Sequence, residues 1–387
     1  MPPLLPRFFA SAPIAVRAIV LMIALLTGVS PALATEPTLT DRAFVFGLPK
    51  AELHVHLEGT MEPELYLQIA QRNHVSIPYA TPDDVRERLR GARDLPSFIR
   101  IYEEFVGALK TEQDFHDLAL GYFRKAHAQG VVYAEVFVDP QLHLERGVAL
   151  KTLYAGLRRA QRDARRELGM ETHYILCFLR DRPAQDAARL LEDSRPWFGN
   201  LIIGVGLDNP EVDAFPEKFA PVFMRAKALG LHRTSHCDVD QPNTVAHHWG
   251  VLRLLDVERI DHGLNVLDDP ALLKEVHDRR IGLTGAPTLF YTDIPGRMEY
   301  RAGAIAKLLD AGTLVTVNSD DPGMKRGLYI GDLMLRVQQT TGMTRQQMVQ
   351  LTRNSFTIAW ISEPRRRRYL AMVDDYIAAQ EPATGIF

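Results

Sequence analysis

Short hydrophobic runs alternate with amphipathic stretches along most of the chain. Apolar or β-branched runs of this kind are typical of strands buried on both faces of a parallel sheet. They predict eight strands, at residues 52–57, 131–138, 172–179, 201–207, 231–236, 258–262, 281–284 and 314–318. The stretches between them, such as 220–229, 244–255, 270–278 and 304–310, have the spacing of helices with one apolar face.

The alternation of strands and helices also predicts the fold class. Strands separated by single helices form parallel βαβ units, and eight such units make a closed (β/α)8 barrel. A doubly wound open sheet is the alternative, but no Gly-x-Gly-x-x-Gly follows the first predicted strand. No internal boundary divides the chain after residue 45, so we expect one barrel domain over about residues 45–375.

The segment between the first two predicted strands is too long for a single crossover connection. Within it, residues 96–109 place Phe98, Ile101, Tyr102 and Phe105 at helical spacing. We therefore expect a helical lid, inserted after the first strand, over the mouth of the barrel. Phe98 and Tyr102 are then candidate substrate contacts, or else they pack against the barrel as ordinary core residues.

The first 34 residues have the parts of a secretory signal peptide. Arg7 and Arg17 precede an apolar run at 18–26, and Ala32-Leu33-Ala34 forms a cleavage site of the Ala-x-Ala type. The run is shorter than the roughly 20 residues that a membrane span needs. We expect cleavage near Ala34 and a periplasmic or secreted protein. The alternatives are an uncleaved anchor and a start codon set too far upstream, which would leave the protein in the cytoplasm.

Composition and charge exclude several classes of protein. The 387 residues include 45 Lys and Arg and 48 Asp and Glu, a formal net charge of −3, and proteins that bind nucleic acid usually carry a basic excess. The two cysteines, Cys177 and Cys237, cannot form a four-cysteine structural zinc site. We therefore expect no nucleic-acid partner.

Titratable side chains stand at the ends of four predicted strands. They are His54 and His56 on the first, His236 on the fifth, His262 on the sixth, and Asp320 with Asp321 on the eighth. Because strand ends meet at one mouth of a barrel, three histidines and one carboxylate would form a catalytic site of the zinc type, with room for a water. Metal-bound water is a nucleophile at neutral pH, and the fourth imidazole, His262, is placed to orient or deprotonate it.

Five segments carry a resemblance to a known family. They are residues 48–60 (LPKAELHVHLEGT), 133–140 (YAEVFVDP), 206–211 (GLDNPE), 258–263 (ERIDHG) and 316–322 (TVNSDDP). In this order they resemble the adenosine/adenine deaminase family of the amidohydrolase superfamily, over about residues 45–375. The resemblance implies a (β/α)8 barrel that holds one zinc through His54, His56, His236 and Asp320.

The resemblance also implies a reaction. The metal-bound water, oriented by His262, would attack the amino-bearing carbon of an adenosine- or adenine-like 6-aminopurine, and ammonia would leave. Asp321 would hydrogen-bond a ring nitrogen of this purine or related heterocycle. Iron or manganese would also suit three histidines and one carboxylate.

The sequence departs from the family after the fifth strand. Family members have His-Ala-Gly-Glu there, and the Glu passes a proton to the purine, whereas this chain has Val239 in the place of the Glu. Valine cannot transfer a proton. Asp238 and Asp240 flank it, and we expect Asp240 to act as the acid, unless both carboxylates face solvent. Asn209 stands where family members contact the base, and is therefore a candidate substrate-binding residue.

These observations support three functions, in decreasing order of preference. The first is a zinc aminohydrolase that acts on a 6-aminopurine. The second is a zinc amidohydrolase that cleaves another C–N bond with Asp320 as the proton shuttle, since such a site needs no Glu at position 239. The third is a non-catalytic receptor outside the cytoplasm, against which the complete ligand set and His262 argue.

Overall fold

A computed structural model describes residues 39–212, 214–237, 241–288 and 295–380. The leader predicted over residues 1–34 lies outside these ranges, and so do Asp238, Val239 and Asp240. Among the helices of the described ranges, none is both long enough and apolar enough to cross a membrane.

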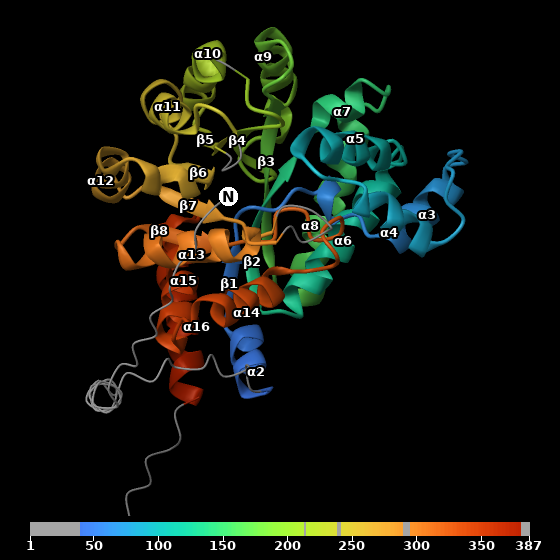
Figure 1. Cartoon of the computed structure of the whole chain (residues 1–387). Coiled ribbons are helices and arrows are strands. Elements are labelled where there is room, and N and C mark those ends of the chain that lie inside the picture. Colours follow the sequence, from blue (N-terminus) through green and yellow to red (C-terminus); the bar gives the residue numbers. More distant parts are fainter. Residues whose placement is uncertain (1–38, 213, 238–240, 289–294, 381–387) are drawn as a thin grey trace, which may run out of the picture. The chain divides into compact units, whose positions relative to one another are not determined.

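Eight parallel strands form the centre of the fold and neighbour one another in chain order (Figure 1). They are β1 (Lys50–Glu52), β2 (Val131–Val138), β3 (Glu171–Leu179), β4 (Ile202–Asp208), β5 (His232–Cys237), β6 (Arg259–His262), β7 (Gly282–Gly285) and β8 (Leu314–Val317). Just beyond β1 and β8, the His56 amide donates to the Asp320 carbonyl (2.8 Å) and the Asp320 amide donates to the His54 carbonyl (3.0 Å). These bonds nearly close the barrel, and the predicted (β/α)8 class is confirmed.

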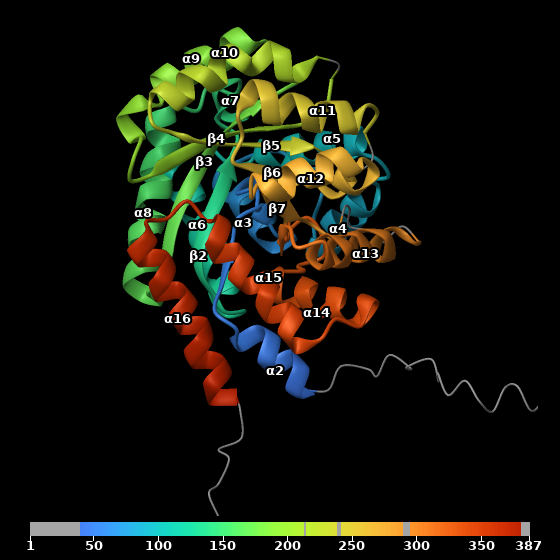
Figure 2. The same ribbon diagram turned by 90° about the vertical axis from the view of Figure 1, so that its left-hand side faces the viewer.

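Helices surround the strands, as Figures 1 and 2 show. The helices outside the segment between β1 and β2 are α2 (Leu39–Gly47), α7 (Pro140–Leu144), α8 (Leu150–Leu168), α9 (Ala184–Asp193), α10 (Phe215–Ala228), α11 (Thr244–Gly250), α12 (Pro270–Asp278), α13 (Arg297–Asp310), α14 (Ile330–Thr341), α15 (Arg345–Ile358) and α16 (Glu363–Gln380). In α8, Leu153, Leu157, Ala160 and Ala164 recur at helical spacing and are buried. This apolar stripe explains why the segment folds as a helix against the barrel.

The first strand differs from its prediction, which placed it at 52–57. The strand is β1, Lys50–Glu52, and the next residues pair with alternating partners. The Leu53 amide donates to the Asn318 side chain, and the Val55 carbonyl accepts from Phe137 on β2. The regular hydrogen-bond ladder with β2 ends at Glu52, because the residues that follow bond alternately to β2 and to the segment after β8. The other seven predicted strands agree with the structure to within one residue at each end.

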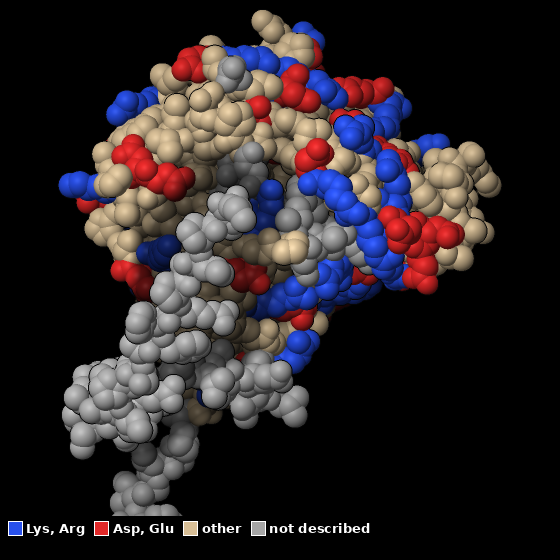
Figure 3. Space-filling view, viewed as in Figure 1, with Lys and Arg blue, Asp and Glu red and all other residues tan. Residues whose placement is uncertain are grey.

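The segment between β1 and β2 is helical, as predicted for a lid. It contains α3 (Pro63–Arg72), α4 (Pro82–Arg90), α5 (Leu95–Val106) and α6 (Glu112–His127). Asp94 caps α5 by accepting from the Ser97 amide (2.8 Å), and Phe98, Ile101, Tyr102 and Phe105 are buried along one face. The surface is hollowed near the middle of the face drawn in Figure 3.

Candidate active site

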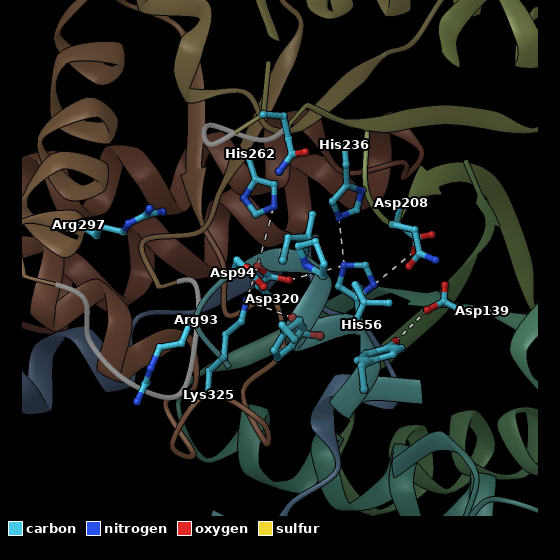
Figure 4. A pocket seen from close by; sticks show the side chains of 18 of the residues that line it. His56, Arg93, Asp94, Asp139, Asp208, His236, His262, Arg297, Asp320 and Lys325 are labelled. Carbon is cyan, nitrogen blue, oxygen red and sulfur yellow. Dashed lines mark hydrogen bonds and ion pairs between the residues drawn. The ribbon is translucent and has the colours of Figure 1, made fainter. Parts of the chain in front are cut away.

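The side chains predicted to meet at the barrel mouth lie together (Figure 4). His54 and His56 follow β1, His236 lies on β5, and Asp320 follows β8. The Nε2 atoms of His56 and His236 are 3.0 Å apart, and the Nε2 atoms of His54 and His56 each lie 3.6 Å from Asp320 Oδ1. All four residues are buried. Three strand ends thus bring three imidazoles and one carboxylate together.

The Nδ1 atoms of His54 and His236 are held by hydrogen bonds to backbone carbonyls. His54 Nδ1 donates to the Thr284 carbonyl (2.9 Å) and His236 Nδ1 donates to the Leu207 carbonyl (2.9 Å). His56 Nδ1 lies 3.6 Å from Asp208 Oδ2. Contacts of this kind fix the ring and leave Nε2 as the ligand atom.

Two properties of this cluster fit a divalent metal ion. His54 Nε2 is buried and has no hydrogen-bond partner among the described residues, as expected of an atom that serves as a metal ligand. Burial lowers the pKa of His56 to about 4, so its imidazole is neutral, as a metal ligand must be. Nitrogen and carboxylate ligands in this number suit zinc, iron or manganese.

Lys325 is a site residue that the sequence analysis missed. Its buried ammonium donates to Asp320 Oδ2 (2.6 Å) and lies 3.1 Å from Asp321 Oδ2. Burial opposes the ionisation of Asp320, but Lys325 and the histidines hold its pKa well below the usual range. Asp320 is thereby ionised, with Oδ2 on the lysine and Oδ1 toward the histidines. In the sequence, its position four residues after Asp321 is the feature that could have pointed to it.

His262 lies beside the cluster at the end of β6. Its ring centroid is 4.6 Å from that of His54, and its Nε2 lies 3.9 Å from Asp320 Oδ2. His262, Asp320 and Asn209 all have positive φ angles, of 61°, 63° and 67°. Non-glycine residues in this conformation cost of the order of 1–3 kcal/mol each, and they gather at functional sites. All three of these residues line the same cavity.

A cavity of about 280 Å³ opens beside the imidazoles. The four predicted substrate contacts line it: Phe98 and Tyr102 from α5, Asn209 after β4, and Asp321 after β8. His56, His236, His262, Asp320 and Lys325 also line it. A space of this size, next to candidate metal ligands and partly apolar, is typical of a small-molecule site. Asp240, the predicted acid, lies outside the described residues.

Two further acids of the cavity were missed. Tyr102 of the lid donates its hydroxyl to Asp139 Oδ2 (2.8 Å), at the end of β2, and Asp208 ends β4 behind His56. Burial and neighbouring carboxylates raise the pKa of Asp139, and the same causes raise that of Asp208. Each residue directly follows a predicted strand, so a search for acids just after every predicted strand would have found them.

A buried pair also lies beneath the lid. The Glu58 carboxylate accepts from His143 Nε2 (2.7 Å), and both side chains are almost fully buried. Together with the Tyr102–Asp139 bond, this pair fastens α5 and α7 to the barrel mouth.

Comparison with known proteins gives a consistent result. The sequence model described as adenosine deaminase matches residues 49–376. An adenine deaminase of Streptomyces coelicolor is 46% identical over 331 residues, 85% of this chain and 96% of that protein. An uncharacterized deaminase of Schizosaccharomyces pombe is 42% identical over 338 residues, 87% of this chain and 98% of that protein.

Two crystal structures resemble this one over most of their length. The adenine deaminase from Arthrobacter aurescens has a TM-score of 0.79 and 32% identity, over 86% of this chain and 99% of that one. An amidohydrolase from Burkholderia ambifaria with bound zinc has a TM-score of 0.80 and 25% identity, over 90% of this chain and 98% of that one.

Proposed function

The chain belongs to the adenosine deaminase family, and from this premise we propose that it is a metal-dependent hydrolase that deaminates an aminopurine and releases ammonia. The single observation that carries the proposal is the cluster of His54, His56, His236 and Asp320, of which the last three line the cavity. Relatives named adenine deaminases, which align over almost their whole length, support the reaction.

The metal in this proposal is one zinc ion held by those four side chains, although iron or manganese would also suit them. A bound zinc-type ion lowers the pKa of a water ligand to about 7 and so supplies a nucleophile at neutral pH. A zinc-containing structure with the same fold supports the choice of zinc. Lys325 keeps Asp320 ionised and leaves Oδ1 for the ion.

Other side chains of the cavity would transfer the proton, bind the purine and exclude water. His262 orients the attacking water and accepts its proton, from a position within 4 Å of Asp320. Asp321 hydrogen-bonds a ring nitrogen of the purine, and Asn209 faces the base from the end of β4. Phe98 and Tyr102 cover the ring from the lid and exclude water from the reacting carbon.

Ammonia release tests this proposal. Metal-loaded enzyme should release ammonia from at least one member of a panel of adenine, adenosine and other aminated purines, pteridines and pyrimidines. A chelator should abolish the release, and zinc should restore it. If no amine in the panel yields ammonia, the proposed reaction is wrong.

The proton donor is a separate part of the proposal. Because Val239 cannot donate a proton, we propose that Asp240 donates one to the ring as the nucleophile adds. Asp240→Asn should lower kcat by about 10²-fold with metal content unchanged, the contribution expected of a positioned acid. Asp238→Asn, two residues away on the same segment, should have a much smaller effect and is the matched control.

A second function gains weight if the Asp240 prediction fails. Val239 favours an amidohydrolase that cleaves a different C–N bond, with Asp320 as the proton shuttle, because that chemistry needs no Glu after the fifth strand. Full activity of both asparagine variants, together with deamination gained by Val239→Glu, would favour this amidohydrolase.

The position of Asp321 depends on a glycine, which gives a further prediction. A Cβ at Gly59 would lie 1.9 Å from Asp321 Oδ1, and the Gly59 carbonyl accepts from the Gly323 amide (3.0 Å). Gly59→Ala should therefore displace the Asp321 carboxylate and lower kcat/KM by about 10²-fold, as small misplacements of a substrate contact do. Kinetics and thermal melting would measure it.

Gly121→Ala on α6 is the matched control, since a Cβ there meets no atom within 4 Å. It should leave kcat/KM unchanged. Equal kinetics for Gly59→Ala and the wild type would show that Asp321 does not need its present position.

A further inference from the structure

The backbone ladder between β4 and β5 stops short of the barrel mouth. In the described part of the chain it ends at the pair Val205 and Arg233. The ladders on either side do reach the mouth, because β3 stays paired with β4, and β5 with β6, up to the last residue of each strand (Figure 1). Asn209, just after β4, and His236 on β5 therefore lie beyond the ladder that joins their strands.

Arg180, the residue that follows β3, spans this gap. Its side chain is fully buried. Its Nε donates to the Asn209 carbonyl (2.7 Å), and its Nη1 donates to the His236 carbonyl (2.6 Å). A guanidinium group carries several N–H donors in a fixed planar arrangement, so one side chain can hold two carbonyls at once. Arg180 thereby supplies a connection that the ladder does not.

The next residue, Asp181, holds the side chain of Asn209. Asp181 Oδ1 accepts from Asn209 Nδ2 (3.1 Å). The φ angle of Asn209 is 67°, a conformation that a non-glycine residue keeps only where its surroundings hold it. Arg180 and Asp181 together fix the backbone and the side chain of a residue that lines the cavity.

The charge of Arg180 is also accommodated at the mouth. Its Nη1 lies 3.9 Å from Glu211 Oε1, which is equally buried, and Glu211 in turn pairs with His247 of α11. A buried charge is costly unless it is paired and hydrogen-bonded, and removing it would leave two buried carbonyls without this donor. Replacement of Arg180 should therefore be felt at both of the residues that it holds.

We propose that Arg180 is a positioning residue that sets the metal ligand His236 and the substrate contact Asn209 relative to each other, and that Asp181 orients Asn209 alone. The inference rests on the proposed function for the roles of His236 and Asn209, and it adds the residues that fix their geometry.

Zinc affinity and kinetics test this proposal. Zinc affinity is measured by competition with a chelator, and kcat and KM are measured at saturating zinc. Arg180→Lys keeps the charge but loses the planar group. It should bind zinc about 10- to 100-fold more weakly, as expected when the support of a ligand is lost, and lower kcat/KM by about 10²-fold. If the lysine variant does not fold, Arg180→Gln replaces it, with the same expected direction.

Asp181→Ala separates the two roles. Asp181 is exposed, so this variant should fold normally. It should leave zinc affinity and kcat unchanged and raise KM by about tenfold, because one hydrogen bond to Asn209 is lost. An unchanged KM would show that Asp181 does not orient Asn209.

Arg259→Lys is the matched control for Arg180→Lys. Arg259 is equally buried, but it begins β6 and contacts Glu135 and the Ile358 carbonyl. Its replacement should lower the melting temperature and leave zinc affinity and kcat/KM unchanged. If Arg180→Lys gives the same result, with zinc affinity unchanged, Arg180 is an ordinary core residue and the inference is wrong.

Hydrogen exchange covers the case in which the protein binds no zinc or releases no ammonia. In metal-free protein, Arg180→Lys should speed amide exchange by about tenfold at residues 206–212 and 235–237, since local contacts set local opening. Arg259→Lys should leave exchange at residues 206–212 unchanged. Faster exchange in Arg180→Lys alone supports the positioning role even if the proposed reaction is wrong. Unchanged exchange overturns this role and leaves the proposed deamination intact.

Discussion

Replacing His54, His56, His236 or Asp320 by alanine should remove most of the bound metal and essentially all turnover. Each side chain supplies one ligand atom to a cluster in which the facing atoms lie 3.0–3.6 Å apart. Removal of one ligand leaves an incomplete site and an uncompensated buried group, and the nucleophile is lost with the ion. Metal content after dialysis, measured by mass spectrometry beside kcat, checks the prediction.

Two comparisons make this experiment specific. His277→Ala on α12 removes an exposed histidine and should change neither metal content nor kcat. Asp208→Asn, which alters the support of His56 Nδ1 but leaves every ligand in place, should weaken metal binding by about 10- to 100-fold. Full metal occupancy in any two of the four ligand variants would show that the ligand set is wrong.

The second large loss of activity is expected for His262, but here, unlike in the ligand variants, the metal should stay bound. His262→Ala should keep the metal and lower kcat by about 10²- to 10⁴-fold, the range for loss of a positioned base. The measurement of metal is essential here, because His262 also lies close enough to His54 and His236 to form a ligand set with them. The prediction therefore separates two roles for the same imidazole.

The outcomes of the His262 experiment are distinct. Loss of both metal and turnover would make His262 a ligand, and unchanged kcat would remove it from the mechanism. His262→Asn keeps a hydrogen-bonding side chain without a base of suitable pKa, so it should lose almost as much activity as the alanine variant. Recovery of activity in His262→Asn would indicate that orientation of the water matters more than proton transfer.

The sequence alone determined the fold class and most of the candidate metal cluster. Strand–helix alternation is a local property, and seven strands could be placed from it to within one residue at each end. In any closed parallel barrel the carboxyl ends of the strands meet. For this reason, residues as distant in the chain as His54 and Asp320 could be predicted to meet before their distances were known.

Only the tertiary structure decided which partners surround these residues. The first strand ends at Glu52 because the chain beyond it pairs with two different neighbours, a choice that no local pattern encodes. The contact of Lys325 with Asp320 and the packing of Gly59 against Asp321 depend on which loops and helices meet over the mouth. Periodicity fixes the face on which a side chain lies, whereas contacts between distant segments depend on how those faces pack together, which the sequence pattern does not specify.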